Sequence, residues 1–279
     1  MVNLNNPIDN LTNDGLGELL DELPLWSAAF GQELLAHIRF QKGMNVLDIG
    51  CGSGFPLITL AQRLGDTCKI YGLEPNEVSF ARAKNKIDLL HLDNISLSKS
   101  TAEEMNFNDG FFDMICSNNG LNNVQDIELS FNNCRRVAKN KCLFIYTMNL
   151  QGTMPIFYET FINVVKAIPD VNIEKKIDRH IHNKRKPLDY LLDLTERADF
   201  KILKTIERHF YMNYIDGTAF LNDFLIRSWF MPLWKELIPN KYQQYVFDEI
   251  EKQLNIIAEE NDYLMLNIPF ICIIAEKNC

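Results

Sequence analysis

The chain has 279 residues, and its 28 lysines and arginines against 37 aspartates and glutamates give a net charge of −9 and a pI of about 5.1. Proteins that hold nucleic acid use clustered basic side chains to displace counterions from the phosphates, so this acidic balance disfavours a nucleic-acid partner. A composition of 47% hydrophobic residues suffices for a packed core, and no apolar run is long enough to span a membrane.

The N-terminus and the cysteines indicate the compartment. The first residues lack the charged and apolar segments of a secretory signal. The seven cysteines form no Cys-x-x-Cys pair, and several lie inside apolar runs, as buried thiols do in reducing compartments. We therefore expect a soluble, cytoplasmic protein without a metal site or a membrane partner. A homodimer is compatible with these features.

Strand-like and helix-like segments alternate through the first half of the chain. A helix is expected at 28–38 with Ser27 as its N-cap. Short apolar runs then predict strands at 45–49, 69–73, 94–98, 111–116 and 141–148, separated by helical patterns at 55–64, 77–90 and 126–138. Most of the strands are nearly continuous in apolar residues, which indicates a parallel sheet covered by helices on both faces.

The second half has a different pattern. Helices are expected at 155–168 and 188–198, and a long helical, aromatic-rich stretch at 217–260. Two further strands, near 200–208 and 263–274, have no crossover after them and are expected to pair antiparallel. Pro269 would interrupt a central ladder, so an edge position or a bulge is expected there. The prediction is an α/β fold: a doubly wound, seven-stranded, mostly parallel sheet with the last strand antiparallel and helical cap additions.

A glycine-rich loop stands between the first strand and its helix. Its sequence, Asp48-Ile-Gly50-Cys-Gly52-Ser-Gly54, allows a tight turn and the close approach of a ligand. Glu74 ends the next strand, where a carboxylate can accept hydrogen bonds from ribose hydroxyls. The spacing Gly-x-Gly-x-Gly differs from the Gly-x-Gly-x-x-Gly of dinucleotide sites, and Asp48 lies near where a phosphate would be. A cationic adenosyl ligand, S-adenosylmethionine (SAM), therefore fits better than a dinucleotide.

These motifs resemble those of the class I SAM-dependent methyltransferases. The likeness runs from about residue 44 to residue 149: 46–54 is similar to the family's first motif, 72–75 to its second, 101–107 to the segment that frames the adenine, and 112–117 to the strand beside the methionine. The resemblance implies a Rossmann-like SAM-binding core at 43–150. An N-terminal helical lid would occupy 1–42, and 151–279 would complete the sheet and add helical substrate-cap insertions.

The resemblance also implies a cofactor site, residue by residue. Asp48 would line the methionyl end, Glu74 would bind the ribose, and Ala102 would present its backbone to the adenine. Thr101 stands where many relatives carry Asp, so its contact with the adenine amino group would be uncharged. The expected cofactor-binding residues are Asp48, Gly50, Cys51, Gly52, Gly54, Glu74, Pro75, Thr101, Ala102 and Glu103, with Ser117 and Asn118 flanking the sulfonium.

The family fixes the methyl donor and leaves the acceptor open. Asn119 and Asn122, after the fourth strand, could orient a polar acceptor or cap a turn. Residues 174–186 hold six basic side chains against two acidic ones. This segment could bind an acidic molecule through Arg185 and supply His180 or His182 as a base, or it could be a solvated segment. A catalytic residue is otherwise unassigned.

Aromatic side chains outside the core pose a similar choice. Trp26 and Phe30 could form part of a lid over the cofactor or belong to a helix core. The expected substrate residues are Trp26, Phe30, Asn119, Asn122, His182 and Arg185. The predicted function is methyl transfer from SAM to a small organic molecule by in-line displacement, leaving S-adenosylhomocysteine. The alternatives are a protein or tRNA methyltransferase, and a SAM-binding regulatory protein without turnover.

Overall fold

A computed structural model describes residues 25–169 and 172–279. These residues form two compact units. The sheet unit holds residues 25–150, 186–208 and 270–279. The helical unit holds the described residues of 151–185 and 209–269. The first 24 residues of the expected lid at 1–42 lie outside the described part of the chain, and the division expected from the sequence remains a prediction.

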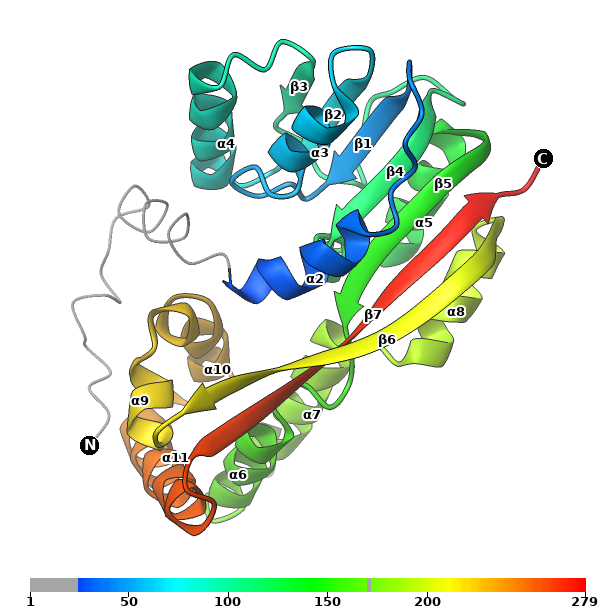
Figure 1. Cartoon of the computed structure of the whole chain (residues 1–279). Helices are drawn as coiled ribbons and strands as arrows, with labels where there is room; N and C mark the ends of the chain where they lie inside the picture. Colours follow the sequence, from blue (N-terminus) through cyan, green and yellow to red (C-terminus); the bar gives the residue numbers. More distant parts are fainter. Residues whose placement is uncertain (1–24, 170–171) are drawn as a thin grey trace. The chain divides into compact units, whose positions relative to one another are not determined.

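The sheet has seven strands in the order β3-β2-β1-β4-β5-β7-β6 (Figure 1). Strands β1 to β5 pair in parallel, and β7 is antiparallel to β5, from Leu143 opposite Glu276 to Asn149 opposite Phe270. The predicted α/β fold is confirmed. The strands are β1 (Asn45–Ile49), β2 (Lys69–Leu73), β3 (Ile95–Ser98), β4 (Phe112–Asn118), β5 (Ala138–Asn149), β6 (Phe200–Tyr214) and β7 (Leu264–Lys277).

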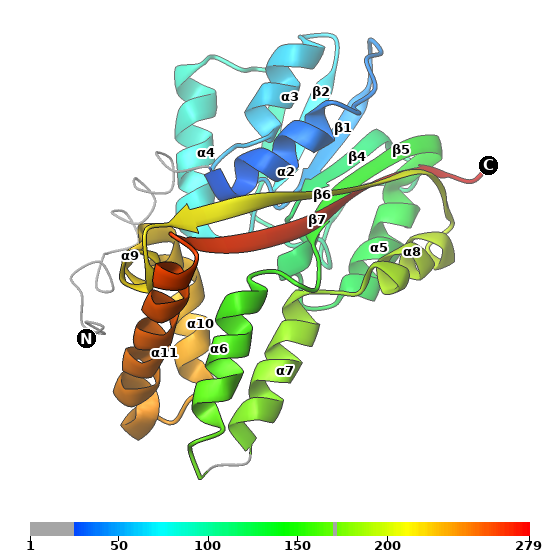
Figure 2. The ribbon, with the colours of Figure 1, turned by 60° about the horizontal axis from the view of Figure 1, so that its bottom comes forward.

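Helices cover both faces of this sheet because its side chains alternate between two cores. Val46 and Met114 point into the core that contains Leu57, the first residue of α3 (Leu57–Leu64). Leu47 and Ile115 point into the core that contains residues of α5 (Ile127–Val137) and α8 (Leu188–Arg197). Figure 2 shows α3 and α5 on opposite sides of the sheet. The helices are α2 (Leu25–Leu35), α3 (Leu57–Leu64), α4 (Glu77–Leu89), η2 (Leu121–Asn123), α5 (Ile127–Val137) and α8 (Leu188–Arg197).

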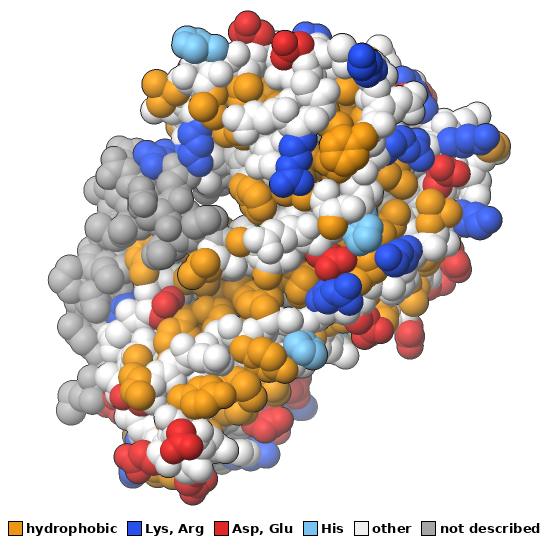
Figure 3. Space-filling model, in the orientation of Figure 1, with side chains coloured by type: hydrophobic (Ala, Val, Ile, Leu, Met, Phe, Trp, Pro, Cys, Tyr) orange, Lys and Arg blue, Asp and Glu red, His pale blue; other side chains and the backbone are white. Residues whose placement is uncertain are grey.

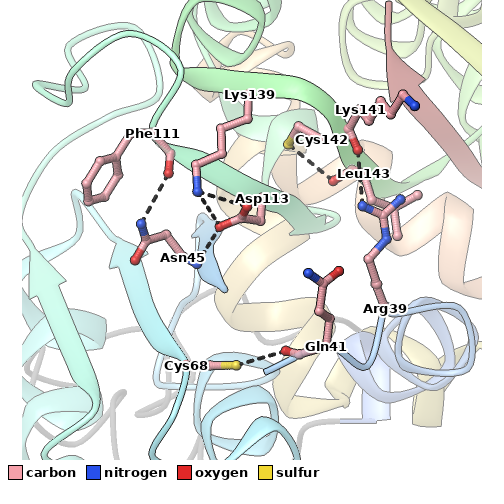
Figure 4. Close-up of polar contacts among 10 residues, drawn as sticks. All are labelled: Arg39, Gln41, Asn45, Cys68, Phe111, Asp113, Lys139, Lys141, Cys142 and Leu143. Atoms are coloured by element: carbon pink, nitrogen blue, oxygen red, sulfur yellow. Dashed lines mark hydrogen bonds and ion pairs between the residues drawn. The ribbon is translucent and has the colours of Figure 1, made fainter. Parts of the chain in front are cut away.

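A polar cluster ties the amino ends of the central strands together (Figure 4). The carboxylate of Asp113 accepts hydrogen bonds from the backbone of Asn45 (2.8 Å) and from Lys139 (2.8 Å). Arg39 donates to the carbonyl of Lys141 at 3.1 Å. These contacts join the starts of β1, β4 and β5, so the sheet is fixed at the edge opposite to the carboxyl ends of its parallel strands.

The helical unit is built around aromatic side chains. Phe157 stacks on Trp234 at 4.0 Å, and Phe220 packs against both rings. All three are fully buried, so these aromatic residues form a core. The elements are α6 (Pro155–Val165), α7 (Asn172–Lys184), α9 (Gly217–Asn222), the π-helix η3 (Ile226–Phe230), α10 (Met231–Glu236) and α11 (Asn240–Glu260). Of the helices that the model describes in either unit, none is both long and apolar enough to cross a membrane.

Three local expectations are corrected by the structure. Helix α2 begins at Leu25, so Ser27 lies inside the helix instead of capping it. The stretch 217–260 is helical but divided: α9 ends at Asn222, η3 continues directly into α10, and α11 begins after Pro239, whose missing N–H suits the start of a new helix. Pro269 lies in β7, an interior strand. The ladder with β5 begins at the next residue, Phe270, so this pairing needs no N–H from Pro269.

Candidate cofactor site

The loop after β1 is bonded to the end of β2. The backbone N–H groups of Gly50 and Cys51 both donate to the carbonyl of Leu73, at 2.9 and 3.0 Å. Gly54 closes the turn by donating to the carbonyl of Cys51 at 3.0 Å. The φ angles of Gly50, Gly52 and Gly54 are +70°, +57° and +112°, a region that favours glycine. The Gly-x-Gly-x-Gly pattern therefore follows from the path of the backbone.

Glu74 lies beneath this loop and holds it. One carboxylate oxygen accepts from the N–H of Gly52 (2.9 Å) and the other from the N–H of Asn76 (2.8 Å). Burial raises the pKa of Glu74, and these two hydrogen bonds act in the opposite direction. A β-carbon on Gly52 would meet no atom of the described residues within 4 Å, so these residues leave open space at this position. Each carboxylate oxygen has a further lone pair with which it could accept a ligand hydroxyl.

Asp48 is a fully buried carboxylate in β1. The thiol of Cys116 donates to Oδ1 at 3.8 Å, and Oδ2 has no hydrogen-bond partner within the described residues. Burial raises the pKa of Asp48 to about 7, and the nearby charge of Glu74 adds to this shift. The bond from Cys116 and the N–H of Leu57 at the start of α3 lower it. A buried acid with one unpartnered oxygen among the described residues suits a ligand that brings positive charge.

The loop after β4 closes against the loop after β1. The hydroxyl of Ser117 donates to the carbonyl of Ile49 (2.9 Å) and accepts from the N–H of Leu121 (3.1 Å). Gly120 comes so close that a β-carbon there would lie 2.3 Å from the carbonyl oxygen of Ile49. The sequence interpretation did not include Gly120, although the dipeptide Asn119-Gly120 is a turn signal.

Asn118 and Asn119 at the end of β4 are held by hydrogen bonds. The Asn118 amide donates to the carbonyl of Ser27 in α2 at 3.1 Å, and its oxygen accepts from the hydroxyl of Thr147 at 3.2 Å. Asn119 has a φ of +57°, and its side-chain oxygen accepts from the N–H of Asn149 at 3.3 Å. The turn interpretation of Asn119 therefore agrees with the geometry.

The segment after β3 is held against the start of α5. Asn133 donates to the carbonyls of Ala102 (3.1 Å) and Glu103 (2.8 Å). One carboxylate oxygen of Glu103 accepts from the N–H groups of Gln125 (2.7 Å) and Asp126 (3.1 Å), while the other is buried without a partner in the described chain. These bonds fix the expected adenine segment through contacts with a neighbouring helix.

Helix α2 packs its aromatic residues within the sheet unit. Phe30 is fully buried and lies 4.7 Å from the ring of Phe270, and Trp26 lies 5.7 Å from Phe30. Gly31 has no room for a side chain, because a β-carbon would lie 2.2 Å from the ring of Phe55. In this structure Phe30 is a core residue, and Gly31 is a second close-approach glycine that the sequence interpretation missed.

The histidine candidates lie in the helical unit, on α7. His180 is partly buried, 6.3 Å from the ring of Tyr158, whose hydroxyl accepts from Trp234 at 3.2 Å. Burial and the charge of the buried Arg185 lower the pKa of His180 to about 4, so it is neutral at pH 7. His182 is exposed. The stretch 174–184 is thus helical, and it gathers His180 and Arg185 near Tyr158.

The structure therefore places the predicted residues in two groups. Asp48, Glu74, the loop glycines, Ser117 and Asn118 all lie at the carboxyl ends of β1, β2 and β4 or in the loops that follow, whereas His180, His182 and Arg185 belong to the helical unit. Cys51 is buried in the core beside α3, so its side chain faces away from any ligand of the loop. Asn122 lies at the short helix η2 and is partly buried.

A doubly wound sheet with a glycine loop after β1 and a carboxylate ending β2 is typical of Rossmann-like proteins, a class whose ligands bind at the carboxyl ends of the strands. Comparison with known families identifies the chain within this class. The family model described as methyltransferase domain matches residues 40–188, more than half of the chain, and the chain belongs to this family. The resemblance inferred from the motifs is confirmed.

Individual proteins resemble the chain more distantly. A demethylmenaquinone methyltransferase of Staphylococcus aureus (strain MRSA252) is 30% identical over 130 residues, which are 47% of this chain and 53% of that protein. The chain thus spans about half the length of the curated relatives it matches. The crystal structure of geranyl diphosphate C-methyltransferase from Streptomyces coelicolor A3(2), in complex with Mg²⁺, geranyl-S-thiolodiphosphate and S-adenosyl-L-homocysteine, has a TM-score of 0.54 at 13% identity. The structural match covers 90% of this chain and 76% of the S. coelicolor chain.

A third similarity shows the breadth of the fold. The [4+2]-cyclase SpnF has a TM-score of 0.54 at 17% identity, covering 90% of this chain and 80% of that protein. At such identities the likeness concerns the fold alone. The reaction of this chain must therefore be argued from its own residues.

Proposed function

We propose that the protein binds SAM at the carboxyl ends of β1 and β2 and transfers its methyl group to a small organic acceptor. The observation that carries this proposal is the pairing of two buried carboxylates with an open glycine. Among the described residues, one oxygen of Asp48 has no hydrogen-bond partner, Glu74 is fixed by two backbone N–H groups, and Gly52 leaves room for a ligand. When bound, SAM supplies an electrophilic methyl group on a sulfonium.

Each residue of the site would have a separate role. Glu74 would accept hydrogen bonds from the ribose hydroxyls, because its position at the end of β2 is fixed before the ligand arrives. Asp48 would provide the negative charge that a cationic ligand needs. Gly50 and Gly52 would let the ligand lie against the backbone, and Ala102 would contact the adenine through its main chain. Cys51 and Pro75 would contribute their backbone only.

A small organic acceptor is supported by charge and by the relatives. The net charge is −9, and on the face of the described residues that Figure 3 shows, basic and acidic side chains are intermixed. A tRNA substrate would need a concentration of positive charge. The matched relative from S. aureus is named for demethylmenaquinone, and the structural neighbour from S. coelicolor for geranyl diphosphate. Both of those names denote small molecules and not macromolecules.

A general base is required only where the acceptor must lose a proton. His180 would be available as a proton acceptor because the lowered pKa keeps it neutral at pH 7. A carbon or oxygen nucleophile that must lose a proton would need such a group, whereas a thiolate or a tertiary amine would not. The chain's contribution to the transfer would then be positioning of the acceptor and exclusion of water.

The experiment that tests this function is a transfer assay with methyl-labelled SAM. The purified protein is offered three acceptor pools: lipid-soluble and water-soluble metabolites, total tRNA, and a protein extract. We expect label in the metabolite pool alone, and loss of that label with the Glu74→Ala variant. Label in tRNA or protein would favour a macromolecular substrate. Tight SAM binding without label in any pool would favour a regulatory protein without turnover.

We also propose a cytoplasmic location. The six described cysteines other than Cys279 are buried and unpaired, and burial raises the pKa of several, including Cys51, Cys116 and Cys134, so these thiols are held in the protonated form. Such thiols suit a reducing compartment. Fractionation of the cells that make the protein, followed by immunoblotting, would test this location.

A further inference from the structure

The strongest unassigned feature is a chain of hydrogen bonds that links β5 to helix α2 through the end of β4. Thr147 of β5 is fully buried, and its hydroxyl donates to the side-chain oxygen of Asn118 at 3.2 Å. The same hydroxyl accepts from the N–H of Asn119 at 3.1 Å. The Asn118 amide nitrogen then donates to the carbonyl of Ser27 at 3.1 Å.

This arrangement fixes which way the Asn118 amide points. An amide can present either its oxygen or its NH₂ group to a neighbour, and only the NH₂ group can bond to a carbonyl. Because the Thr147 hydroxyl donates to the oxygen, the NH₂ group is turned toward α2. Gly31, one turn after Ser27, leaves the space for this approach, since a β-carbon there would lie 3.1 Å from the Asn118 nitrogen.

We infer that Thr147 is a positioning residue that latches the first turns of α2 over the carboxyl end of β4 by orienting the amide of Asn118. The inference rests on the proposed function, in which Asn118 flanks the cofactor. These hydrogen bonds would keep α2 and the loop after β4 in a fixed position relative to each other. Binding of the cofactor beside Asn118 would stabilise the latch, and loss of the latch would weaken the binding.

Helix α2 is suited to such a role because part of its attachment is polar and local. Its inner face buries Trp26, Phe30 and Leu34 against the sheet unit. These apolar contacts, including those of Trp26 in the first turn, hold the helix in place, and the bond from Asn118 to Ser27 adds a directional polar contact in the same turn. The cofactor would thus act on a helix that stays packed and changes only its local stability.

The test uses a pair of conservative variants and a matched control. Thr147→Val keeps the shape and removes the hydroxyl, whereas Thr147→Ser keeps the hydroxyl. The control is Thr195→Val: Thr195 is also fully buried, and its hydroxyl bonds to Tyr146 (2.7 Å) and to the carbonyl of Leu191 (2.7 Å). Tyr146 precedes Thr147 in β5 and faces the opposite core.

Hydrogen exchange of the amides in residues 25–35 is measured without and with SAM, and SAM affinity is measured by calorimetry. In Thr147→Val we expect exchange in α2 to be about tenfold faster than in the wild type, and SAM affinity to be about tenfold weaker, because the hydroxyl's buried hydrogen bonds to Asn118 and Asn119 are lost. Thr147→Ser and Thr195→Val should keep wild-type exchange in α2. Exchange in α2 that rises equally in Thr147→Val and Thr195→Val overturns the inference.

The two proposals fail in different ways. If the wild-type protein does not bind SAM, the proposed function is wrong, but the latch is still judged by exchange in α2 in the absence of ligand. If the wild type binds SAM and Thr147→Val binds it equally well with unchanged exchange in α2, the cofactor proposal stands and the latch is wrong.

Discussion

Gly50 and Gly120 lie back to back, and a β-carbon on Gly50 would sit 2.8 Å from the Cα of Gly120. The two residues follow β1 and β4, strands that are neighbours in the sheet. Contacts below 3.0 Å between such atoms are sterically forbidden, so neither loop can carry a side chain here without moving the other. The close approach couples the glycine loop to the segment that contains Asn118 and Asn119.

We predict that Gly120→Ala weakens SAM binding. An alanine at a glycine that has a positive φ but open space around it should not weaken SAM binding. Gly120 has a φ of −71°, which alanine adopts freely, so the effect would come from steric clashes with Ile49, Gly50 and Ser117 and not from backbone strain. The expected loss of stability is about 1–3 kcal/mol, with a fall in SAM affinity of at least about tenfold. The measurements are urea unfolding and calorimetric titration.

The matched control for this prediction is Gly110→Ala. Gly110 has a φ of +61° and open space around a β-carbon. This substitution should cost about 1 kcal/mol through backbone strain and leave SAM affinity unchanged. Equal SAM affinities in the two variants would contradict the coupling between the loops.

We predict that SAM binds more tightly as the pH rises from about 5.5 to about 7. In the free protein the pKa of Asp48 is about 7, with Glu74, Cys51 and Cys116 as its neighbouring titratable groups. A positive ligand beside Asp48 would lower that pKa, so binding below pH 7 would release a proton. Titrations in buffers of different ionisation enthalpy should show this release. Asp48→Asn should bind more weakly, and its affinity should vary less over the same range.

The same carboxylate predicts a pH-dependent stability. A pKa raised from 3.8 in the unfolded chain to about 7 in the folded one favours folding below pH 4, and this contribution is lost as the pH rises through 7. Between pH 4 and 8 the stability of the wild type should fall relative to Asp48→Asn, by an amount on the order of 4 kcal/mol. Urea unfolding at several pH values measures the difference. A constant difference would mean that Asp48 is ionised in the folded protein throughout.

The polar cluster at the amino ends of the strands should affect stability and leave the site intact. Asp113→Ala removes the acceptor for the Asn45 N–H and for Lys139, and we expect a loss of about 1–2 kcal/mol. The control is Asp109→Ala, which breaks an exposed ion pair with Arg136 and should cost at most about 1 kcal/mol. Both variants should bind SAM like the wild type. Weakened binding in either would place these residues in the site.

The sheet could be predicted because its strands are short apolar runs with clear ends. The predicted strand at 45–49 coincides with β1 and the one at 69–73 with β2, since each is buried on both faces and followed by a turn. The interior position of β7 and its register around Pro269 could not be predicted. The effect of Pro269 depends on which residues pair with β5, and that register is set by contacts far away in the sequence.

The site could be predicted only where a motif describes it. Asp48, Glu74 and the loop glycines follow from local spacing, and the structure places them together at the carboxyl ends of β1 and β2. Gly31, Gly120 and Thr147 could not be found in this way. Each matters because of an atom that is distant in sequence: the ring of Phe55, the carbonyl of Ile49 and the amide of Asn118.

The most direct test of the proposed cofactor site is calorimetric titration of SAM, and of NADH for comparison, into the wild type, Glu74→Ala, Glu74→Gln and Glu77→Gln. Glu77 is the control, because it is an exposed acid at the start of α4, three residues after Glu74. We predict SAM binding without NADH binding in the wild type, affinity about 10–100-fold weaker in both Glu74 variants, and affinity within about twofold in Glu77→Gln. Unchanged SAM affinity in both Glu74 variants, or binding of NADH in place of SAM, would contradict the account.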